Sequence, residues 1–463
     1  MMADGGVRDW GLGLFVALCL ALTAAAPTPK SGPGSGPSVH EGVASCANST
    51  CHGRQVASGL VVRQNELVTW QDPSGSAGAH ARAFRALGQP RAQAIANRLG
   101  LGPAERASAC LGCHTDPASG RGERFQIADG VGCEACHGGA GHAGSGGWLA
   151  SHYALGATHA ANVAAGMTAL DNPRVRAGVC LDCHFGSARN QQFVSHELMS
   201  AGHPRLSFEL DLFTELQRHH DVDADYPARG KTVAGGVKTW ALGQTMALQR
   251  ALALYADPQT GQAGAFPEFA FFDCHSCHRQ ISDEAATRPA FQPNAARPIP
   301  HGAPPFNDES MIVLTAAARV AAPALAERFE SDAMAFHASL ARDRPSAVRA
   351  AAQLARTTVA LENTFQGHPF SRAETLAILD QVTGDALSGR YTDYTGGAQA
   401  VMAIDTLLTA LMASGPSDAG AAAAAVRSEI NRAYQAVRDP NGWRPAAFRE
   451  ALTRVAAAIR RLR

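Results

Sequence analysis

The chain has 463 residues, with 40 basic and 40 acidic side chains and a formal net charge of zero. A balanced charge of this kind argues against nucleic acid as a partner and against general attraction to an anionic membrane surface. Aromatic residues make up only 6% of the chain and charged residues 17%. The core must therefore be built either from helices packed on Ala and Leu or partly from a group that is not protein.

Residues 1–26 have the pattern of an export signal. Arg8 precedes the apolar run WGLGLFVALCLALTAAA at 10–26, which ends in small residues. The competing interpretation is an uncleaved N-terminal membrane anchor, although a run of this length is at the short limit for a span. We expect cleavage and a periplasmic protein, with a flexible linker at 27–39 that is rich in Gly, Pro and Ser.

The cysteines carry the strongest signal in the sequence. Cys19 lies in the export segment, and the other ten form five pairs, each followed directly by a histidine. We number these motifs in chain order: site 1 is Cys46, Cys51 and His52; site 2 is Cys110, Cys113 and His114; site 3 is Cys133, Cys136 and His137; site 4 is Cys180, Cys183 and His184; site 5 is Cys274, Cys277 and His278.

The spacing indicates covalently attached haem c. Two thiols separated by two residues can form thioether bonds to the two vinyl groups of haem, and the next histidine then supplies the proximal nitrogen to iron. Structural zinc would join two pairs into one site and would leave the fifth pair over. A disulfide framework or a thioredoxin-type dithiol does not explain a histidine after every second cysteine. Site 1 has four residues between its cysteines and needs a bulged loop to reach the same two vinyl groups.

A six-coordinate haem needs a second axial ligand, and the chain holds thirteen further histidines for this role. The candidates lie close to the motifs, often beside glycines that let the backbone turn sharply. They are His80, His142, His152, His159, His196 and His203, with His219 and His220 ranked after them. His152 and His159 are seven residues apart, as are His196 and His203, so on a continuous helix each pair would share a face.

Residues 40 to 282 resemble the multihaem cytochromes related to the tetrahaem electron acceptor of hydroxylamine oxidoreductase. The stretches that carry the resemblance are TWQDPSGSAGAHARAF, GVGCEACHGGAGH, HELMSAGHPRLSFEL and FPEFAFFDCHSCHR. The resemblance implies a largely helical, loop-rich fold around closely stacked haems, with distal-ligand roles for His80, His142 and His203. The chain departs from the family pattern in the spacing of site 1 and in having five motifs where the tetrahaem member has four. Haem order and ligand pairing therefore do not carry over as a whole.

The fold class expected is mainly α, with a loop-rich multihaem cytochrome c domain at 40–285 followed by an all-α helical bundle at 308–463. A Pro-rich linker at 286–307 separates the two. One long helix is expected within the first domain, at 235–256. Apolar residues recur at helical spacing after 308, which predicts five or six helices, and Pro323 should end or kink the first of them.

The leading functional interpretation is an electron carrier with about five haem c groups. Its partners would be redox proteins, a dehydrogenase or a reductase, either soluble or membrane-associated. The alternative is a multihaem oxidoreductase that acts on a nitrogen or sulfur compound at one haem with an open face. Site 1 is then the natural candidate, because its spacing is unusual. A haem-based sensor or scaffold is a third class, which no feature of the sequence specifically supports.

Overall fold

The fold was analysed in a computed structural model of the chain. The structure describes residues 38–59, 63–142, 147–190, 192–219, 222, 225–262, 267–274, 277–278, 294, 296–299, 303–391, 393–413, 420–440 and 442–462. The expected export segment therefore lies outside the described residues, as do nearly all of the flexible linker and most of the Pro-rich linker. The mainly α fold is confirmed over the described part of the chain.

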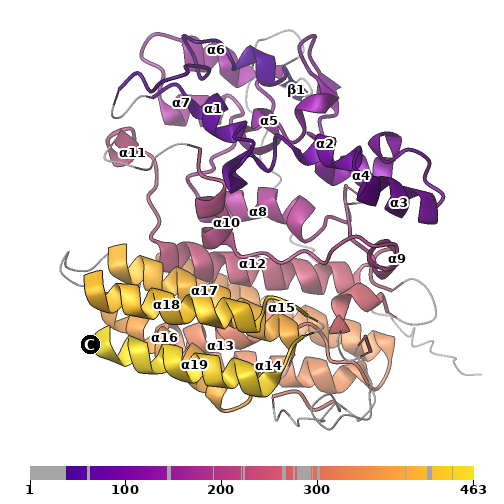
Figure 1. The fold of residues 1–463 in the computed structure, drawn as a ribbon, viewed down its shortest axis with the longest axis vertical. Coiled ribbons are helices and arrows are strands. Elements are labelled where there is room, and N and C mark those ends of the chain that lie inside the picture. Colours follow the sequence, from indigo (N-terminus) through magenta and orange to yellow (C-terminus); the bar gives the residue numbers. More distant parts are fainter. Residues whose placement is uncertain are drawn as a thin grey trace, which may run out of the picture.

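The N-terminal part consists of short helices joined by long turns, and it forms the upper half of Figure 1. Its α-helices are α1 (Glu66–Trp70), α2 (Ala83–Leu87), α3 (Pro90–Arg98), α4 (Ser108–His114), α5 (Cys133–His137), α6 (Gly147–Tyr153), α7 (His159–Ala164), α8 (Pro173–His184), α9 (His196–Ser200), α10 (Leu210–Leu216) and α11 (Asp225–Ala228). Short 3-10 helices lie at Val43–Ser45, Ser76–Gly78, Ala104–Arg106, Ile127–Asp129 and Phe269–Phe271. Buried apolar clusters here are small, such as the one formed by Leu87, Ala96 and Ala104.

A small sheet ties the start of the described chain to the third cysteine motif. Strand β1 (Ser38–His40) lies in the middle, parallel to β2 (Gly120–Arg121) and antiparallel to β3 (Gly141–His142). Val39 is paired with Gly120 on one side and with Gly141 on the other. The strands are too short to be recognised from periodicity, and their pairing depends on the turns that bring them together.

The C-terminal part is a bundle of long helices, seen as the lower half of Figure 1. Its helices are α13 (Glu309–Ala321), α14 (Pro323–Leu340), α15 (Arg344–Gly367), α16 (Arg372–Leu387), α17 (Tyr394–Ala413), α18 (Gly420–Ala436) and α19 (Pro445–Ile459), with a final 3-10 turn at Arg460–Leu462. Among the residues the structure describes after 308 there are thus seven α-helices. The expectation of five or six was too low.

Two sequence features explain the difference in helix number. Pro323 ends one helix and begins the next at its first position, as expected, so one apolar stretch gives both α13 and α14. Helix α16 was missed because it buries polar side chains such as Thr375 and Thr383 together with Ile378 and Leu379, which blurs the apolar pattern.

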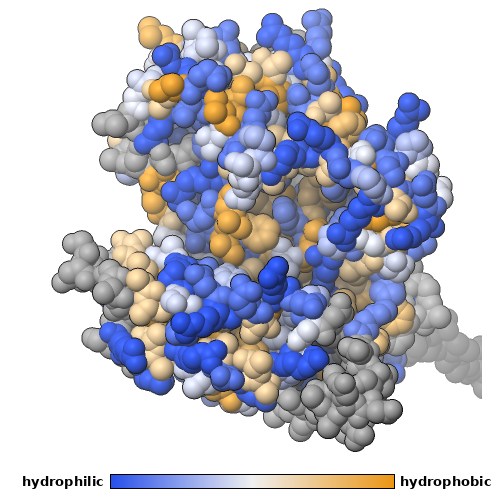
Figure 2. All heavy atoms as spheres, in the orientation of Figure 1, coloured by the Kyte–Doolittle hydropathy of each residue, from blue (hydrophilic) through white to orange (hydrophobic). Residues whose placement is uncertain are grey.

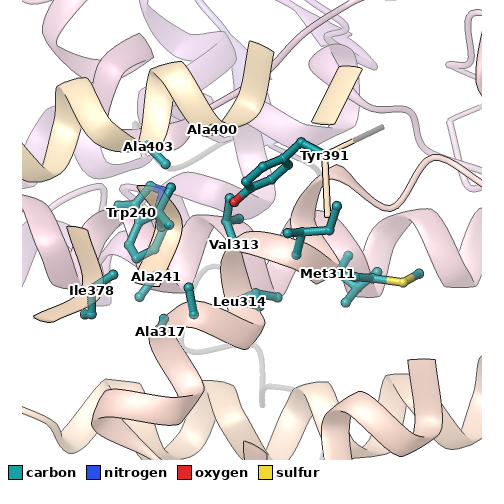
Figure 3. Packing of buried hydrophobic residues seen from close by; sticks show 14 of the residues in the cluster. Trp240, Ala241, Met311, Val313, Leu314, Ala317, Ile378, Tyr391, Ala400 and Ala403 are labelled. Atoms are coloured by element: carbon teal, nitrogen blue, oxygen red, sulfur yellow. The ribbon is translucent and has the colours of Figure 1, made fainter. Parts of the chain in front are cut away.

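Helix α12 (Gly236–Ala256) belongs to the bundle in space, although the sequence places it within the first part. It packs against α13, α15 and α17 of the bundle and, on its other side, against α8 and α10. Trp240 of α12 is fully buried beside Ala403 of α17, while Tyr391 points toward Val313 of α13 (Figure 3). This helix is therefore the seam between the two parts of the molecule.

Helix α17 is long and apolar enough to cross a membrane, the one helix of this kind within the described residues. In the structure 67% of its apolar window is buried inside the bundle, against α10, α12, α13, α16 and α18. Its hydrophobicity is accounted for by this central position in the core.

Two helical glycines of the bundle should respond oppositely to alanine. A Cβ at Gly397 in α17 would overlap the ring of Trp443, whereas a Cβ at Gly384 in α16 would meet nothing within 4 Å. We expect G397A to lower the free energy of unfolding by about 1–3 kcal/mol through overpacking. We expect G384A to raise it by about 0.5–1 kcal/mol because alanine favours the helix. Thermal and urea denaturation followed by far-UV circular dichroism measure both, and equal effects of the two substitutions would contradict this packing.

Candidate functional site

The cysteine motifs of sites 2, 3 and 4 lie at the C-terminal ends of short helices. Helices α4, α5 and α8 each end on the histidine of its motif: His114, His137 and His184. One helical turn places the two cysteines of a C-x-x-C-H motif side by side and carries the histidine into the same region. The local sequence therefore presents two thiols and one imidazole to the same space.

Site 1 reaches a similar arrangement through a turn rather than a helix. The side chain of Asn48 accepts hydrogen bonds from the Thr50 backbone N–H and hydroxyl, both at 2.9 Å, and the His52 N–H donates to the Cys46 carbonyl at 3.2 Å. This turn absorbs the two additional residues. Gly53 follows at a place where a Cβ would overlap the Ala47 carbonyl, so the close return of the chain requires glycine.

Each motif histidine faces a second histidine from a distant part of the chain. The ring centroids are 6.1 Å apart for His52 and His152, 6.1 Å for His80 and His184, 6.4 Å for His114 and His203, 6.3 Å for His137 and His219, and 6.0 Å for His196 and His278. The interplanar angles range from 20° to 89°, so direct ring stacking is not the common feature. The common feature is the distance.

This distance fits one metal ion between two imidazoles. An imidazole nitrogen lies about 2.0–2.1 Å from a bound first-row metal and about 1.1 Å from its own ring centre, so two imidazoles on opposite faces of one iron have centres about 6.3 Å apart. The five measured separations span 6.0–6.4 Å. The residues present therefore fit haem iron with two axial histidines at every motif.

Hydrogen bonding at the other ring nitrogen supports the same geometry. The Nδ1 atoms lie within hydrogen-bond distance of Glu66 for His52, the Ala83 carbonyl for His114, the Pro204 carbonyl for His203 and the Gln217 carbonyl for His219, at 2.8–3.2 Å. A ring held through Nδ1 has Nε2 available for a metal, as is usual for ligating histidines.

His152 completes this pattern once the orientation of one amide is considered. Its Nδ1 lies 3.3 Å from the side-chain nitrogen of Asn162, whose Oδ1 is buried without a hydrogen-bond partner. The two ends of an amide are assigned from their surroundings. Turning the Asn162 amide over would let Oδ1 accept a hydrogen bond from Nδ1–H of His152, so that Nε2 of His152 stays available for a metal.

The remaining predicted histidines are placed differently. His159 uses Nε2 in a 3.0 Å ion pair with Asp171, whose other oxygen accepts the Thr232 N–H, and it faces no motif histidine. His152 lies in the last turn of α6, whereas His159 begins α7. The two histidines are therefore on different helices, and the expected shared helical face does not form. The backbone of His142 lies in β3, and the position of its side chain is not described; His220 lies outside the described residues. His196 begins α9 and His203 lies beyond its end, and the two face different sites, 5 and 2.

Burial keeps several of these imidazoles neutral. It lowers the pKa of His184 to about 4, with a further contribution from nearby His80, and it lowers the pKa of His80, His152, His203 and His219. Only a neutral imidazole can bind a metal ion. His52 is the exception, since its hydrogen bond to Glu66 raises its pKa.

The cysteine motifs lie against one another. A side-chain hydrogen bond links Cys46 to Cys133 and lowers the pKa of the Cys46 thiol, and another links Cys113 to Cys183 and lowers that of Cys113. The nearby Cys180 contributes to raising the pKa of Cys136, although burial is the larger cause. The side-chain nitrogen of Gln192 also donates to the Gly112 carbonyl and to Cys183, 3.3 Å away. Sites 1, 3, 4 and 2 therefore adjoin in that order.

Glu134, between the two cysteines of site 3, anchors the motif to the small sheet. Its side chain is 3% exposed. One carboxylate oxygen accepts the N–H groups of Glu41 at 2.9 Å and Ala140 at 2.7 Å, and the other accepts the N–H of Gly42 at 2.7 Å. Sequence reasoning singled out the cysteines and histidine of CEACH but not this residue.

The described residues do not support a disulfide framework or a structural metal site at the cysteine motifs. No disulfide bond joins any of the ten described cysteines. The described part of the chain also contains no group of three or more His, Cys, Asp or Glu side chains arranged to hold a metal ion on their own. The motifs instead bring two thiols and two opposed imidazoles together, which is the donor set of a haem c site.

Comparison with known families supports a c-type cytochrome, a class defined by covalently bound haem c. Residues 45–138 match the family model of cytochrome c554 and c-prime. The matched stretch contains sites 1, 2 and 3. Comparisons with curated proteins and with solved structures gave no significant match.

Replacing Glu134 tests its role as the anchor of site 3. E134Q keeps the shape of the side chain but turns an NH2 group toward backbone donors, so we expect a loss of about 1–3 kcal/mol in the free energy of unfolding. Hydrogen exchange of the backbone amides of Gly42 and Ala140 should accelerate. The matched control is E123Q, at an exposed position in the same part of the chain, which should leave both unchanged. Equal exchange rates in E134Q and the parent protein would rule out the anchoring role.

Proposed function

We propose that this protein is a multihaem c-type cytochrome that carries electrons between redox partners through five haem c groups, each held by two thioether bonds and two axial histidines. The thioether cysteines are those of sites 1–5, and the proximal ligands are their histidines. The distal ligands are His152 for site 1, His203 for site 2, His219 for site 3, His80 for site 4 and His196 for site 5. The observation that carries the proposal is the 6.0–6.4 Å separation at all five sites.

This arrangement favours a carrier over a catalyst. Catalysis at haem needs an open iron face, with acid–base or cationic groups beside it. Each of the five motif histidines in the described structure has another imidazole opposite it, including His52 of the unusual site 1. Site 1 was the natural candidate for an open face, and the position of His152 removes the reason for choosing it.

The bound haem supplies one-electron redox chemistry, and the chain sets where and at what potential that chemistry occurs. Paired imidazoles lower the reduction potential relative to a histidine–methionine pair. Hydrogen bonds to Nδ1 fix the orientation of each imidazole and increase its basicity. Contacts between the motif cysteines keep sites 1, 3, 4 and 2 adjacent, which suits the movement of electrons from one site to the next.

We propose a periplasmic location for the mature protein. The N-terminal sequence favours export, and haem c is attached outside the cytoplasm, so the mature protein would be periplasmic, either free or anchored by an uncleaved segment. Its partners would be redox proteins, a dehydrogenase that donates electrons and a reductase that accepts them. Such partners can bind transiently through small interfaces.

The direct test is the mass of the mature protein, produced in a cell competent in cytochrome maturation. We expect a mass increase equal to five haems, with peptides showing modification of both Cys46 and Cys51. The reduced protein should give the absorption of low-spin haem, and nitric oxide, hydroxylamine and nitrite should leave the spectrum of the folded protein unchanged. Turnover of any of these compounds at a high-spin haem would favour the oxidoreductase instead.

Substitution of His219 tests the ligand that the sequence ranked low. H219A should convert one haem in five from low spin to high spin, because site 3 loses one of its two imidazoles, and added imidazole should restore the low-spin state. Electron paramagnetic resonance measures the fraction of each state.

The matched control is H159A, since His159 was predicted as a ligand from sequence but pairs with Asp171 in the structure. It should leave all five haems low spin. A high-spin signal in H159A, or none in H219A, would refute this ligand assignment.

A further inference from the structure

A cavity lies where the bundle meets the N-terminal part of the chain, lined by His184 of site 4 and by Arg205, which contacts Cys274 of site 5. It has a volume of ≈ 60 Å³, and its lining includes Arg205 and His184 from the N-terminal part and Glu309 from α13. Figure 2 shows the molecular surface hollowed between the two parts of the molecule. A partly buried cation, Arg205, and a buried carboxyl group, Glu309, thus line the same cavity from different parts of the chain.

Arg205 is fixed beside a cysteine of site 5. Its Nη1 atom donates hydrogen bonds to the Phe272 carbonyl at 3.2 Å and to Sγ of Cys274 at 3.3 Å. The guanidinium is permanently charged, and it lies against the sulfur that would be bonded to haem. A haem bonded to Cys274 would therefore have this positive charge close to its point of attachment.

Glu309 is the opposite charge, and it comes from the bundle. Its side chain is 6% exposed, and Oε1 accepts a hydrogen bond from the Asn307 amide at 3.0 Å. The Oδ1 atom of Asn307, which also lines the cavity, is buried without a hydrogen-bond partner in the described structure.

The charges around Glu309 leave its protonation finely balanced. Burial raises its pKa to about 7, while Arg205 opposes the increase. Asp308 on the same element and Asp393 at the start of α17 raise the pKa further. Both of these aspartates also pair with the buried Arg297, which limits their effect. Glu309 thus changes charge near neutral pH, whereas Arg205 does not.

We propose that Arg205 and Glu309 set the reduction potential of site 5, so that the C-terminal bundle acts as a positioning and tuning element for this haem. The inference rests on the proposed function, because it requires haem at Cys274 and Cys277. A fixed positive charge favours the reduced iron, which carries one positive charge fewer than the oxidised iron. A carboxylate favours the oxidised iron.

The test is a spectroelectrochemical titration of the intact protein and its variants. R205Q should lower the midpoint potential of site 5, and E309Q should raise the same potential at pH 8. Site 4, whose His184 lines the same cavity, should shift less and in the same direction, while sites 1, 2 and 3 should keep their potentials. R205K keeps the charge and should retain the parent potential. A variant without the two cysteines, C274A/C277A, lacks this haem and identifies its potential by its absence.

A control of matched charge separates a local effect from net charge. R319Q removes a partly exposed arginine from the same helix as Glu309, where it pairs with Glu330 and Asp385, and it should leave all five potentials in place. Unchanged potentials in R205Q and E309Q, or an equal shift in R319Q, would overturn the inference. If the parent protein holds five haems but the potentials do not respond as expected, the inference about Arg205 and Glu309 fails and the proposed function stands. If the parent protein has no haem at Cys274 and Cys277, both the inference and the proposed function fail.

The pH dependence provides a second readout. Reduction removes positive charge beside Glu309 and so raises its pKa, which means that the carboxyl group takes up a proton from solvent as the site accepts an electron. The site 5 potential should therefore fall as the pH rises through about 7 in the parent protein. It should be independent of pH over this window in E309Q. An unaltered slope in E309Q would assign the proton to another group and contradict the role of Glu309.

Discussion

The opposition of two imidazoles at a separation that admits one iron atom is the constraint on which the N-terminal part of this protein depends. It recurs at five places with nearly the same distance, although the ring planes differ widely. Such uniformity cannot come from packing of imidazoles against each other, which would favour particular angles. It also explains the architecture. Short helices and tight turns deliver histidines to chosen positions, while the buried apolar clusters in this part remain small. Porphyrin then supplies the interior that the side chains do not.

The helical bundle follows a different physical rule. Its core is continuous and is built from Ala, Leu, Val, Phe and one buried tryptophan, and it extends into α12. Because α12 also packs on α8, which carries the motif of site 4, this motif is held directly against the bundle. Buried ion pairs at the edge of the bundle, between Arg297 and the carboxylates of Asp308 and Asp393, hold the segment that precedes α13 in place.

Sequence reasoning succeeded for features that are local and failed for features that depend on distant contacts. The five Cys-His motifs, the long helix α12 and the break at Pro323 can be recognised because each is defined by residues within a few positions of each other. His219 was ranked low because it follows the end of α10 without a motif or glycine turn nearby, yet it lies opposite His137. The number of motifs offered one signal for a ligand at His219, because five proximal histidines require five distal ligands if every iron has two axial histidines. His159 looked equivalent to His152, but a neighbouring aspartate occupies its Nε2.

The sequence by itself determined the proximal half of every site, since two cysteines and a histidine on one turn are brought together by the covalent chain. It also predicted a loop-rich part followed by an Ala- and Leu-rich helical part. Tertiary structure decided which histidine completes each site, because the two members of every pair are at least 82 residues apart in the sequence. It also brought Arg205 and Glu309 to one cavity. Distances between such residues arise only when the whole chain has packed, so no local pattern could specify them.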